Sequence, residues 1–474
     1  KVDASTEQAT PVVPSVEQKP PRVPSDLAWF AFGGGSDPLS NQVSLEQDLT
    51  LASGSFAGRG LVLFASGKGA PVARARSDVQ SVDAPLPERA RAALARLLAP
   101  QGSERLHYEP SALTIDGPAT RDLVLDTLRS ALTTQGDPLL VLAASHGDHG
   151  QVPRQNALAL WGGWGLSVED VAALLDREES VRPTRLVVTA CYGGGFAELA
   201  FVGADPKRGA RAPEHCGLFA APWDDESSGC DPDPDRVRQE SFTIHFLAAL
   251  RGEDRHGRKH PEIDLDGDRK VSLLEAHAWA RIHAHSLDVP TTTSERYLRE
   301  YAPANELGRA EEREELTVIE ALASELELPD ERSARGKLRE LDRILSDATA
   351  QLDDAQQAAE DTFYALRIAL LERWPLLDHS WDPRAEAVID RDAHAILALL
   401  ADSELAQASA ISQRELDDAS AQHDAVRIAR ARVQRLVHAF ETTRLAAALE
   451  RRGGAHYQHY RALRACERFT PAMR

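Results

Sequence analysis

The sequence predicts an α/β fold with a mostly parallel sheet sandwiched by helices, followed by an all-α helical hairpin or bundle. Strand-like and helix-like segments alternate between Ser25 and about Pro303, as they do where helices connect parallel strands. Within this region, two aliphatic runs at 139–144 and 185–190 have the length and β-branched content of buried strands. From about Asn305 the chain is rich in Ala, Leu, Glu, Arg and Asp and poor in Gly, which indicates a change to helices.

The elements expected in the α/β part follow one another in order along the chain. Ser167 and Asp170 have the spacing of a capping box, which satisfies backbone N–H groups at the start of a helix. The expected elements are a strand at 61–65, helices at 88–98 and 121–132, a strand at 139–146, a helix at 167–176, and strands at 185–191 and 216–221.

The last third of the chain has the spacing of a coiled coil. From Leu338 to Ala369, apolar and small residues advance by alternating steps of three and four, which is typical of a helical seam. The same spacing recurs from Val426 to Phe440 and predicts a second long helix packed on the first. One further helix is expected near 385–400, in a connection that contains Pro375 and Pro383. Such an arm would bind a protein partner, self-associate, restrain the site, or serve as a passive structural element.

The composition limits the functional class. The 474 residues, 42% hydrophobic and 27% charged, are enough for a sizeable core. The formal net charge of −20 argues against a general nucleic-acid binder, because such binding needs clustered Lys and Arg. No apolar run approaches the length of a transmembrane span.

The ends of the chain suggest how it is divided. Residues 1–24 contain five prolines among polar residues and predict a disordered tether. The expected domains are this tether, an α/β domain at 25–304, and a helical domain at 305–474. The chain begins at Lys1 rather than Met, and a proline-rich tether behind a processed N-terminus slightly favours an exported protein over a cytoplasmic one.

The four cysteines do not form a disulfide scaffold. Cys216 and Cys230 bracket a short loop and could pair in an oxidising compartment. Cys466 stands alone near the C-terminus.

Two of the predicted strands end in a reactive side chain followed by glycine, one in His146–Gly147 and the other in Cys191 before Gly193–Gly195. Because the carboxyl ends of neighbouring parallel strands meet at one edge of a sheet, we expect His146 and Cys191 to lie close together. A thiol becomes a nucleophile when an imidazole takes its proton and unobstructed backbone N–H groups hold the oxyanion. A helix that begins at these glycines would also lower the pKa of the thiol. The alternative is one buried Cys and an unrelated His on two core strands.

Three further segments accompany this pair: Gly33–Ser36, Asn41–Glu46 and Leu160–Gly163. Together, these features of the α/β part resemble the caspase-like cysteine peptidases, and within them the bacterial legumain-type branch. The resemblance implies that His146 and Cys191 form a catalytic dyad and that the amides of Gly147 and Cys191 line an oxyanion hole. The implied reaction is hydrolysis of a peptide bond in a protein or peptide substrate through an acyl-enzyme. A transpeptidase or ligase of the same fold and a catalytically silent scaffold are the alternatives.

The substrate preference stays open between two classes. The resemblance places Arg74 in the primary specificity pocket, where it would favour Asn or Asp before the cleaved bond. Thr189, two residues before the nucleophile, departs from the Glu, Gln or Asp of the related families. If Asp224, Asp225 or, above all, Asp231 points into the pocket, the charges would instead select Arg or Lys. A solvated acidic loop would have the same sequence.

A basic loop at 203–215 follows the strand that ends in Cys191. By resemblance to caspases this connection is a processing site, and a basic loop beside an acidic pocket predicts self-cleavage there. A plain exposed loop is the alternative.

Residues 264–275 fit a twelve-residue EF-hand loop, in which a short segment supplies several oxygen ligands to one calcium ion. Position six is Arg269, where glycine is usual because the backbone turns there in the left-handed region. The sequence predicts calcium and no organic cofactor, and the alternative is an acidic turn that caps a helix at 272–282. The expected ligands are Asp264, Asp266, Asp268, the carbonyl of Lys270, Ser272 and Glu275.

Overall fold

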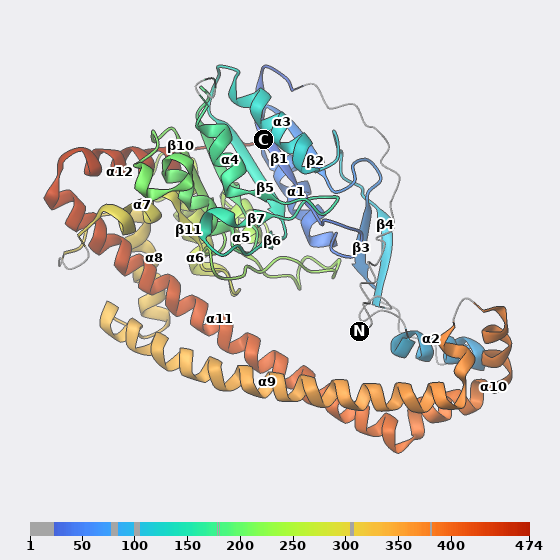
Figure 1. Ribbon diagram of the computed structural model, residues 1–474. Helices are drawn as coiled ribbons and strands as arrows, with labels where there is room; N and C mark the ends of the chain where they lie inside the picture. The colour runs from blue at the N-terminus through green and yellow to red at the C-terminus, as the bar shows by residue number, and fades with distance from the viewer. Residues whose placement is uncertain are drawn as a thin grey trace, which may run out of the picture.

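The computed structural model of the chain describes residues 23–76, 84–98, 105–177, 179, 181–303, 308–379 and 382–474. Figure 1 shows a central sheet flanked by helices, with a long helical arm that extends beside this body. Only residues 23 and 24 of the predicted N-terminal tether are described, so the rest of that prediction lies outside the described residues.

A six-stranded sheet forms the centre of the body. Its strand order is β11-β10-β9-β5-β1-β2, and every neighbouring pair is parallel except β10 and β11. The mostly parallel sheet predicted from the sequence is therefore confirmed. The strands are β1 (Leu27–Gly34), β2 (Arg59–Phe64), β5 (Leu139–Ser145), β9 (Thr184–Val188), β10 (His215–Phe219) and β11 (Thr291–Thr292).

Strand β1 is not among the predicted elements, yet it lies between β5 and β2. Its side chains alternate between two cores, with Trp29 and Ala31 in one and Phe30 and Phe32 in the other. Because both faces of the strand are covered, its sequence is a continuous apolar run without polar alternation. The glycines at its end have the composition of a loop, which obscures the strand in the sequence.

Helices cover both faces of the sheet. One apolar core joins the sheet to α1, α5 and α6, and the other joins it to α3, α4 and the 3₁₀ helix η3. The predicted capping box is present at α4, where Ser167 Oγ accepts a hydrogen bond from Asp170 N and Asp170 Oδ2 accepts one from Ser167 N. The bounds are α1 (Val43–Ser55), α3 (Arg121–Leu132), α4 (Val168–Leu175), η3 (Gly193–Ala200), α5 (Phe242–Ala249) and α6 (Leu273–His283).

Two smaller sheets and several short helices complete the body. Strands β3 and β4 form an antiparallel pair, and β6, β7 and β8 form a three-stranded sheet. The bounds are β3 (Pro71–Ala75), β4 (Leu106–Pro110), β6 (Gly147–Asp148), β7 (Ala157–Leu158), β8 (Leu166–Ser167), α7 (Thr293–Tyr301), α8 (Arg313–Glu325) and α12 (Gly454–Glu467), with 3₁₀ turns η2 (Pro153–Gln155), η4 (Val202–Ala204), η5 (Pro206–Arg208), η6 (Pro261–Ile263) and η7 (Pro375–Asp378).

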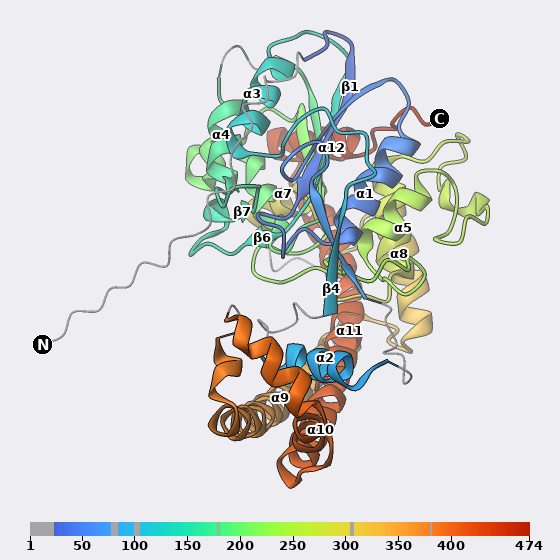
Figure 2. The same cartoon turned by 90° about the vertical axis from the view of Figure 1, so that its right-hand side faces the viewer.

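The predicted helical hairpin is an arm in which α9 (Glu331–Arg373) packs along α11 (Glu404–Arg452), with α10 (Pro383–Asp402) at the tip (Figure 1). The seam residues Leu341 and Leu366 are buried, as the spacing predicts. Figure 2 shows α11 running from the tip into the body. Within the described residues no single helix has the length and apolar character of a membrane span, although α10 and α11 together, across a bend of 47°, meet that criterion of length and composition.

Helix α2 (Leu86–Leu98) lies at the tip of the arm and not against the sheet (Figures 1 and 2). Its apolar face joins α9 and α10 in one cluster, and Arg91 pairs with two carboxylates of α10 at 2.6 and 2.9 Å. The helix is predicted from the sequence, but these partners are 295 and 299 positions away. The buried residues of its apolar face are Ala90, Leu94 and Leu97.

The disulfide between Cys216 and Cys230 that the sequence leaves open does not form, because Cys216 pairs with Cys466. Helix α12 carries Cys466 and packs in one apolar cluster with Cys216 of β10. The paired residues are 250 positions apart, so no local pattern indicates them. Cys230 is a free and exposed cysteine.

Candidate active site

The two predicted catalytic residues follow neighbouring strands. Strands β5 and β9 are parallel and adjacent, with Ala143 opposite Val188. His146 comes directly after β5, and Cys191 follows β9 after two residues. Both therefore lie at the carboxyl edge of the sheet, where open α/β sheets bind ligands.

The backbones of the two segments touch beyond the strands. A Cβ atom placed on Gly147 would lie 1.9 Å from the carbonyl oxygen of Cys191, closer than any side chain can approach. Only glycine fits this position, because it lets two backbones meet. The two predicted oxyanion donors, Gly147 and Cys191, thus come from segments in contact.

The Cys191 thiol is half-buried and is held by Ser227. Ser227 N donates to Cys191 Sγ at 3.3 Å, and the thiol donates toward Ser227 O at 3.5 Å. Burial raises the pKa of Cys191 above its ordinary value, and the charges of Glu226 and Asp288 add to this, whereas the Ser227 contacts lower it. The net shift is therefore upward, opposite to the lowering of the pKa expected from a helix after Cys191.

The His146 ring has one nitrogen fixed as the proton donor. Its Nε2 lies 2.8 Å from the carbonyl oxygen of Ser40 and 2.8 Å from Gln42 Oε1. Because a carbonyl oxygen only accepts hydrogen bonds, Nε2 carries the proton and Nδ1 is the basic nitrogen. Nδ1 lies 3.2 Å from Cys230 Sγ. Among the hydrogen bonds of the described residues none joins His146 to Cys191, so Cys230 occupies the base in this structure.

Residues 223–230, which we call the capping loop, include Cys230 and contact the Cys191 thiol through Ser227. Asn156 Nδ2 donates to Trp223 O at 2.6 Å, and Tyr192 N donates to Asp225 O at 2.9 Å. These bonds fasten the capping loop to the chain segment that carries the nucleophile. The loop therefore lies directly against the site.

Helix α11 of the arm holds the capping loop by charge. Arg427 Nη2 lies 2.8 Å from Glu226 Oε2, and Arg430 Nη1 lies 3.7 Å from Asp225 Oδ2. These side chains are partly exposed, so each pair contributes about 1 kcal/mol or less. Asp225, a predicted pocket residue, is thus paired with the arm.

A second link from α11 to the capping loop is buried. Arg435 is fully buried and donates to the carbonyl oxygens of Asp288, Ala284 and Ser286 at 2.6, 2.5 and 2.8 Å. The Asp288 carboxylate accepts hydrogen bonds from Ser228 N at 3.0 Å and Phe242 N at 2.8 Å. Burial raises the pKa of Asp288, and Arg435 opposes that rise. Through Asp288, the arm helix thus fixes the residue next to Ser227.

Arg74, on β3, is already paired with two carboxylates. Its Nη2 lies 2.8 Å from Glu46 Oε2, and its Nε lies 3.0 Å from Glu109 Oε2. The buried Glu46 carboxylate also accepts from Ser111 Oγ and Ala112 N at 2.7 Å. An arginine held in this way offers little net charge to an acidic substrate.

The other predicted pocket residues lie in different settings. Thr189 is buried beyond β9, and its Oγ1 donates to Ala143 O at 3.3 Å. Asp224 is exposed in the capping loop. Asp231 directly follows Cys230, and its N–H donates to Ser44 Oγ at 2.8 Å. Of these residues, Asp231 is the carboxylate closest in the chain to the thiol that contacts His146.

The basic loop at 203–215 is partly folded into 3₁₀ turns. Arg211 is buried, with Nη1 2.5 Å from Asp176 Oδ1. Lys207 and Arg208 are exposed in η5. Of the three basic residues Lys207, Arg208 and Arg211, only the first two are therefore accessible to a protease.

The predicted calcium loop brings three carboxylates together. Oxygen atoms of Asp264, Asp266 and Asp268 lie within 4.8 Å of one another. Arg269 has a φ of 70°, so position six adopts the left-handed turn of an EF-hand loop although it is not glycine. These three carboxylates could together hold a metal ion, and oxygen ligands of this kind are those that hard cations prefer.

The remaining expected calcium ligands have other partners. Ser272 N donates to Glu275 Oε2 at 2.8 Å, and Glu275 N donates to Ser272 Oγ at 3.2 Å, so the two residues cap α6. Glu275 Oε1 also accepts from Leu265 N at 2.8 Å. The expected ligand atom of Lys270 is its carbonyl oxygen, whereas its N–H donates to Asp268 Oδ1 at 2.8 Å. The structure thus brings together the first three ligands, and Glu275 forms the helix cap that was the alternative.

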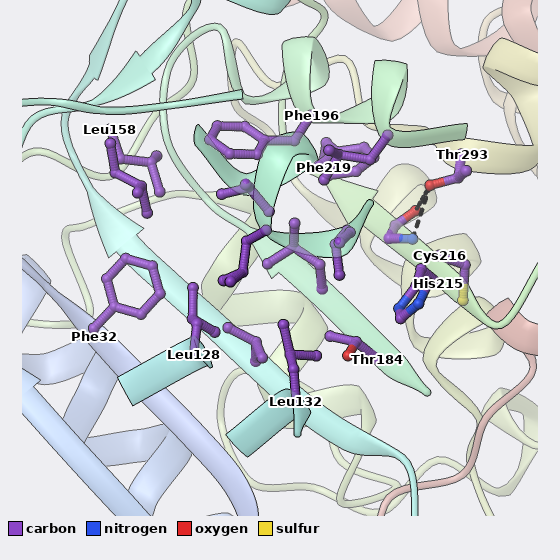
Figure 3. A pocket seen from close by; sticks show the side chains of 18 residues that line it. Phe32, Leu128, Leu132, Leu158, Thr184, Phe196, His215, Cys216, Phe219 and Thr293 are labelled. Atoms are coloured by element: carbon purple, nitrogen blue, oxygen red, sulfur yellow. Dashed lines mark hydrogen bonds between the residues drawn. The ribbon is translucent and has the colours of Figure 1, made fainter. Parts of the chain in front are cut away.

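An apolar cavity lies between the sheet and helices α3, α4 and η3 (Figure 3). Its lining is almost entirely aliphatic and aromatic and includes neither His146 nor Cys191. His215 lies at one end, as Figure 3 shows, and burial together with the charges of Arg211 and Arg185 lowers its pKa to about 4. The ring is therefore neutral at pH 7, and the cavity is separate from the Cys191 site.

Several residues of the site are not among the predicted ones. Gln42 lies in the segment 41–46 that carries part of the family resemblance, so the sequence does hold a signal for it. Ser227 and Cys230 lie beside the predicted acidic residues, but their contacts with the dyad leave no local pattern in the sequence. No protein-family model and no curated protein matches the chain.

Proposed function

We propose that the chain is a caspase-like cysteine endopeptidase in which Cys191 is the nucleophile and His146 is the general base. The observation that carries the proposal is the pairing of β5 with β9, which brings His146 and the contact between Gly147 and Cys191 to one edge of the sheet. A Cys–His pair works when a third group orients the imidazole. Ser40 O has that role here, because it accepts the Nε2 proton.

In the proposed reaction, His146 Nδ1 takes the proton of Cys191, and the thiolate attacks the carbonyl carbon of the scissile bond. The N–H groups of Gly147 and Cys191 stabilise the oxyanion. The imidazolium then protonates the leaving amine, and water hydrolyses the thioester. Because Cys230 lies on Nδ1 in this structure, the proposed active form has a displaced capping loop.

A basic substrate residue, Arg or Lys, is the proposed preference before the cleaved bond. Arg74 is neutralised by its two carboxylates. Asp231 directly follows Cys230, so a carboxylate lies one residue from the thiol that contacts His146. A positional peptide library tests this preference, and selection of Asn or Asp would instead assign the pocket to Arg74.

A thiol-directed probe tests the proposed function itself. Labelling of Cys191 that is absent in Cys191→Ala, together with cleavage of library peptides, would support the endopeptidase. Labelling without cleavage, but with products formed when an amine is added, would indicate a transpeptidase or ligase. A chain that neither labels nor cleaves would be a scaffold whose arm binds a partner or a second copy. Self-cleavage, if present, is expected after Lys207 or Arg208 and not after the buried Arg211.

Release of the capping loop should increase the reactivity of Cys191. We expect Arg427→Glu combined with Arg430→Glu to speed alkylation by about three- to tenfold, because two pairs of about 1 kcal/mol or less are replaced by repulsion. Burial raises the pKa of Cys191, so the alkylation rate of the wild type should still increase at pH values above the pKa of an ordinary thiol. The alkylation rate of the variant should reach its plateau at a lower pH. Iodoacetamide kinetics from pH 6 to 10 measure both. Arg414→Glu on the same helix is the control, and equal rates in all three proteins would contradict the link.

Calcium is proposed to bind residues 264–275. Asp264, Asp266 and Asp268 would hold the ion with the Lys270 carbonyl, and its positive charge would remove the repulsion among three carboxylates. Glu275 caps α6 in this structure through its hydrogen bonds with Ser272.

Calcium should therefore raise the thermal midpoint of the wild-type chain. At a calcium concentration of about 100 times Kd, the free energy of unfolding should rise by about 2.7 kcal/mol. Differential scanning calorimetry with calcium and with a chelator measures the change. Asp266→Asn with Asp268→Asn should remove the effect, whereas the exposed pair Asp417→Asn with Asp418→Asn should keep it; a wild-type midpoint unchanged by calcium would count against the site.

A further inference from the structure

Two unpaired cysteines meet at the candidate site. Cys191 and Cys230 are free, whereas Cys216 and Cys466 form a disulfide. Cys191 Sγ contacts Ser227, and Cys230 is three residues further along the same capping loop. Three residues span at most about 11 Å, so the second sulfur is tied close to the first by a short stretch of chain.

The two thiols differ in how they are placed for chemistry. Cys230 is exposed, and its sulfur lies 3.2 Å from the basic Nδ1 of His146. Cys191 is half-buried and contacts only Ser227 among its hydrogen-bond partners in the described residues. In this structure the base His146 contacts Cys230 and not Cys191. Cys230 is therefore the thiol that a small oxidant from solution would reach first.

The chain between the two contacts can turn. Gly229, directly before Cys230, has a φ of 130°, a backbone region open to glycine. Ser228 is held by Asp288 and Asp231 is held by Ser44, so residues 229 and 230 are the short stretch of the loop between two anchors. A disulfide needs Cα atoms within about 7 Å of each other, and rotation at Gly229 would supply the movement that brings the two cysteines to this distance.

We propose that Cys230 and Cys191 form a reversible disulfide when the protein meets a hydroperoxide, and that this bond switches the site off. His146 Nδ1 takes the Cys230 proton, the thiolate attacks one peroxide oxygen, and the leaving hydroxide takes the proton, which gives a sulfenic acid and one water. Cys191 then attacks the Cys230 sulfur, again losing its proton to His146, and the departing hydroxide leaves as a second water. Two thiols are oxidised by two electrons, and hydrogen peroxide is reduced to two waters.

The bond would protect Cys191 as well as block it. A sulfur held in a disulfide cannot attack a carbonyl group, and it is shielded from the irreversible steps beyond sulfenic acid. A thiol reductant restores both groups. The Cys216–Cys466 disulfide supports a compartment in which such oxidation occurs, because disulfides persist in oxidising environments.

The experiment uses the full chain with hydrogen peroxide and reads the sulfurs directly. After alkylation of free thiols and digestion without reductant, mass spectrometry should find a peptide that joins Cys191 to Cys230 and disappears with dithiothreitol. Probe labelling of Cys191 should fall by about tenfold with peroxide and return with reductant. The Cys216–Cys466 peptide should be present with and without peroxide and serves as the internal control.

Two variants establish the order of events. In Cys191→Ser, peroxide should leave a sulfenic acid on Cys230 that dimedone traps; in Cys230→Ser, Cys191 should react more slowly and lose labelling that reductant does not restore. Absence of the joined peptide in the wild type, or full recovery of Cys230→Ser, would overturn the proposal. These readouts need no peptide cleavage, so a chain that forms the disulfide but cleaves no peptide would contradict the proposed function alone.

Discussion

Cleavage of a preferred peptide by Cys191→Ala should be lower than that of the wild type by about 10³-fold or more, because the variant has no sulfur to form the acyl-enzyme. Cys191 is half-buried at the sheet edge, and removal of its sulfur should leave the fold intact. The measurement is kcat/KM for the best library peptide, with the thermal midpoint as the check on folding. Wild-type cleavage by the variant would exclude the proposed nucleophile.

The matching change at the base separates a catalytic from a structural role. His146→Ala should lose peptide cleavage to a similar extent, whereas Cys191 should still be alkylated at high pH, where thiols ionise without a base. His149 is the control, because its ring stacks on Trp223 with centroids 5.4 Å apart and has no place in the proposed reaction. His149→Ala should stay within about tenfold of the wild type; an equal loss in both variants would show only that the capping loop had moved.

Arg435→Met should lower the free energy of unfolding by about 3–5 kcal/mol, since it removes one partner of a fully buried charged network. The carbonyl oxygens of Ala284 and Ser286 would lose their donor, and the buried Asp288 would lose its counter-charge. Urea unfolding measures the change, and Arg414→Met, on the exposed part of the same helix, should change stability by less than about 0.5 kcal/mol.

The loss at Arg435 should also depend on pH. Without the guanidinium, the pKa of buried Asp288 should rise further above its unfolded value. A carboxyl group with a raised folded pKa contributes stability at low pH, and that contribution is lost as the pH rises. The destabilisation should therefore be smaller at pH 4 than at pH 8. A loss independent of pH would mean that Arg435 acts through its backbone contacts alone, and faster alkylation of Cys191 in this variant would show that the buried link also restrains the capping loop.

The parts of the fold that follow from local pattern are predictable from the sequence. Strands β5 and β9 are largely apolar runs that are followed within a few residues by glycine, and α3, α4 and the arm helices have clear periodicity or caps. A parallel connection between such strands places their ends at one edge, so local pattern is enough to predict that His146 and Cys191 lie near each other. Strand β1 is not predicted in this way, because apolar and polar residues do not alternate in a strand that is buried on both faces.

The parts that depend on distant contacts are not predictable in this way. The Cys216–Cys466 bond spans 250 positions, and the pairing of Arg427 with Glu226 spans 201. The position of Cys230 on His146 depends on where the capping loop is tied at Asp288 and α11, and no spacing in the sequence records those ties. Tertiary packing therefore decides which thiol meets the base.

The route of the chain around α2 has a practical consequence. The polypeptide leaves the body after β3, supplies α2 to the far tip of the arm, and returns to form β4. A fragment that stops at residue 303 would expose the apolar face of α2 to solvent and would leave Cys216 without its disulfide partner. The α/β body and the arm are interleaved along the chain, so separate expression of either part should cause aggregation. Limited proteolysis without reductant should release neither part as an intact fragment.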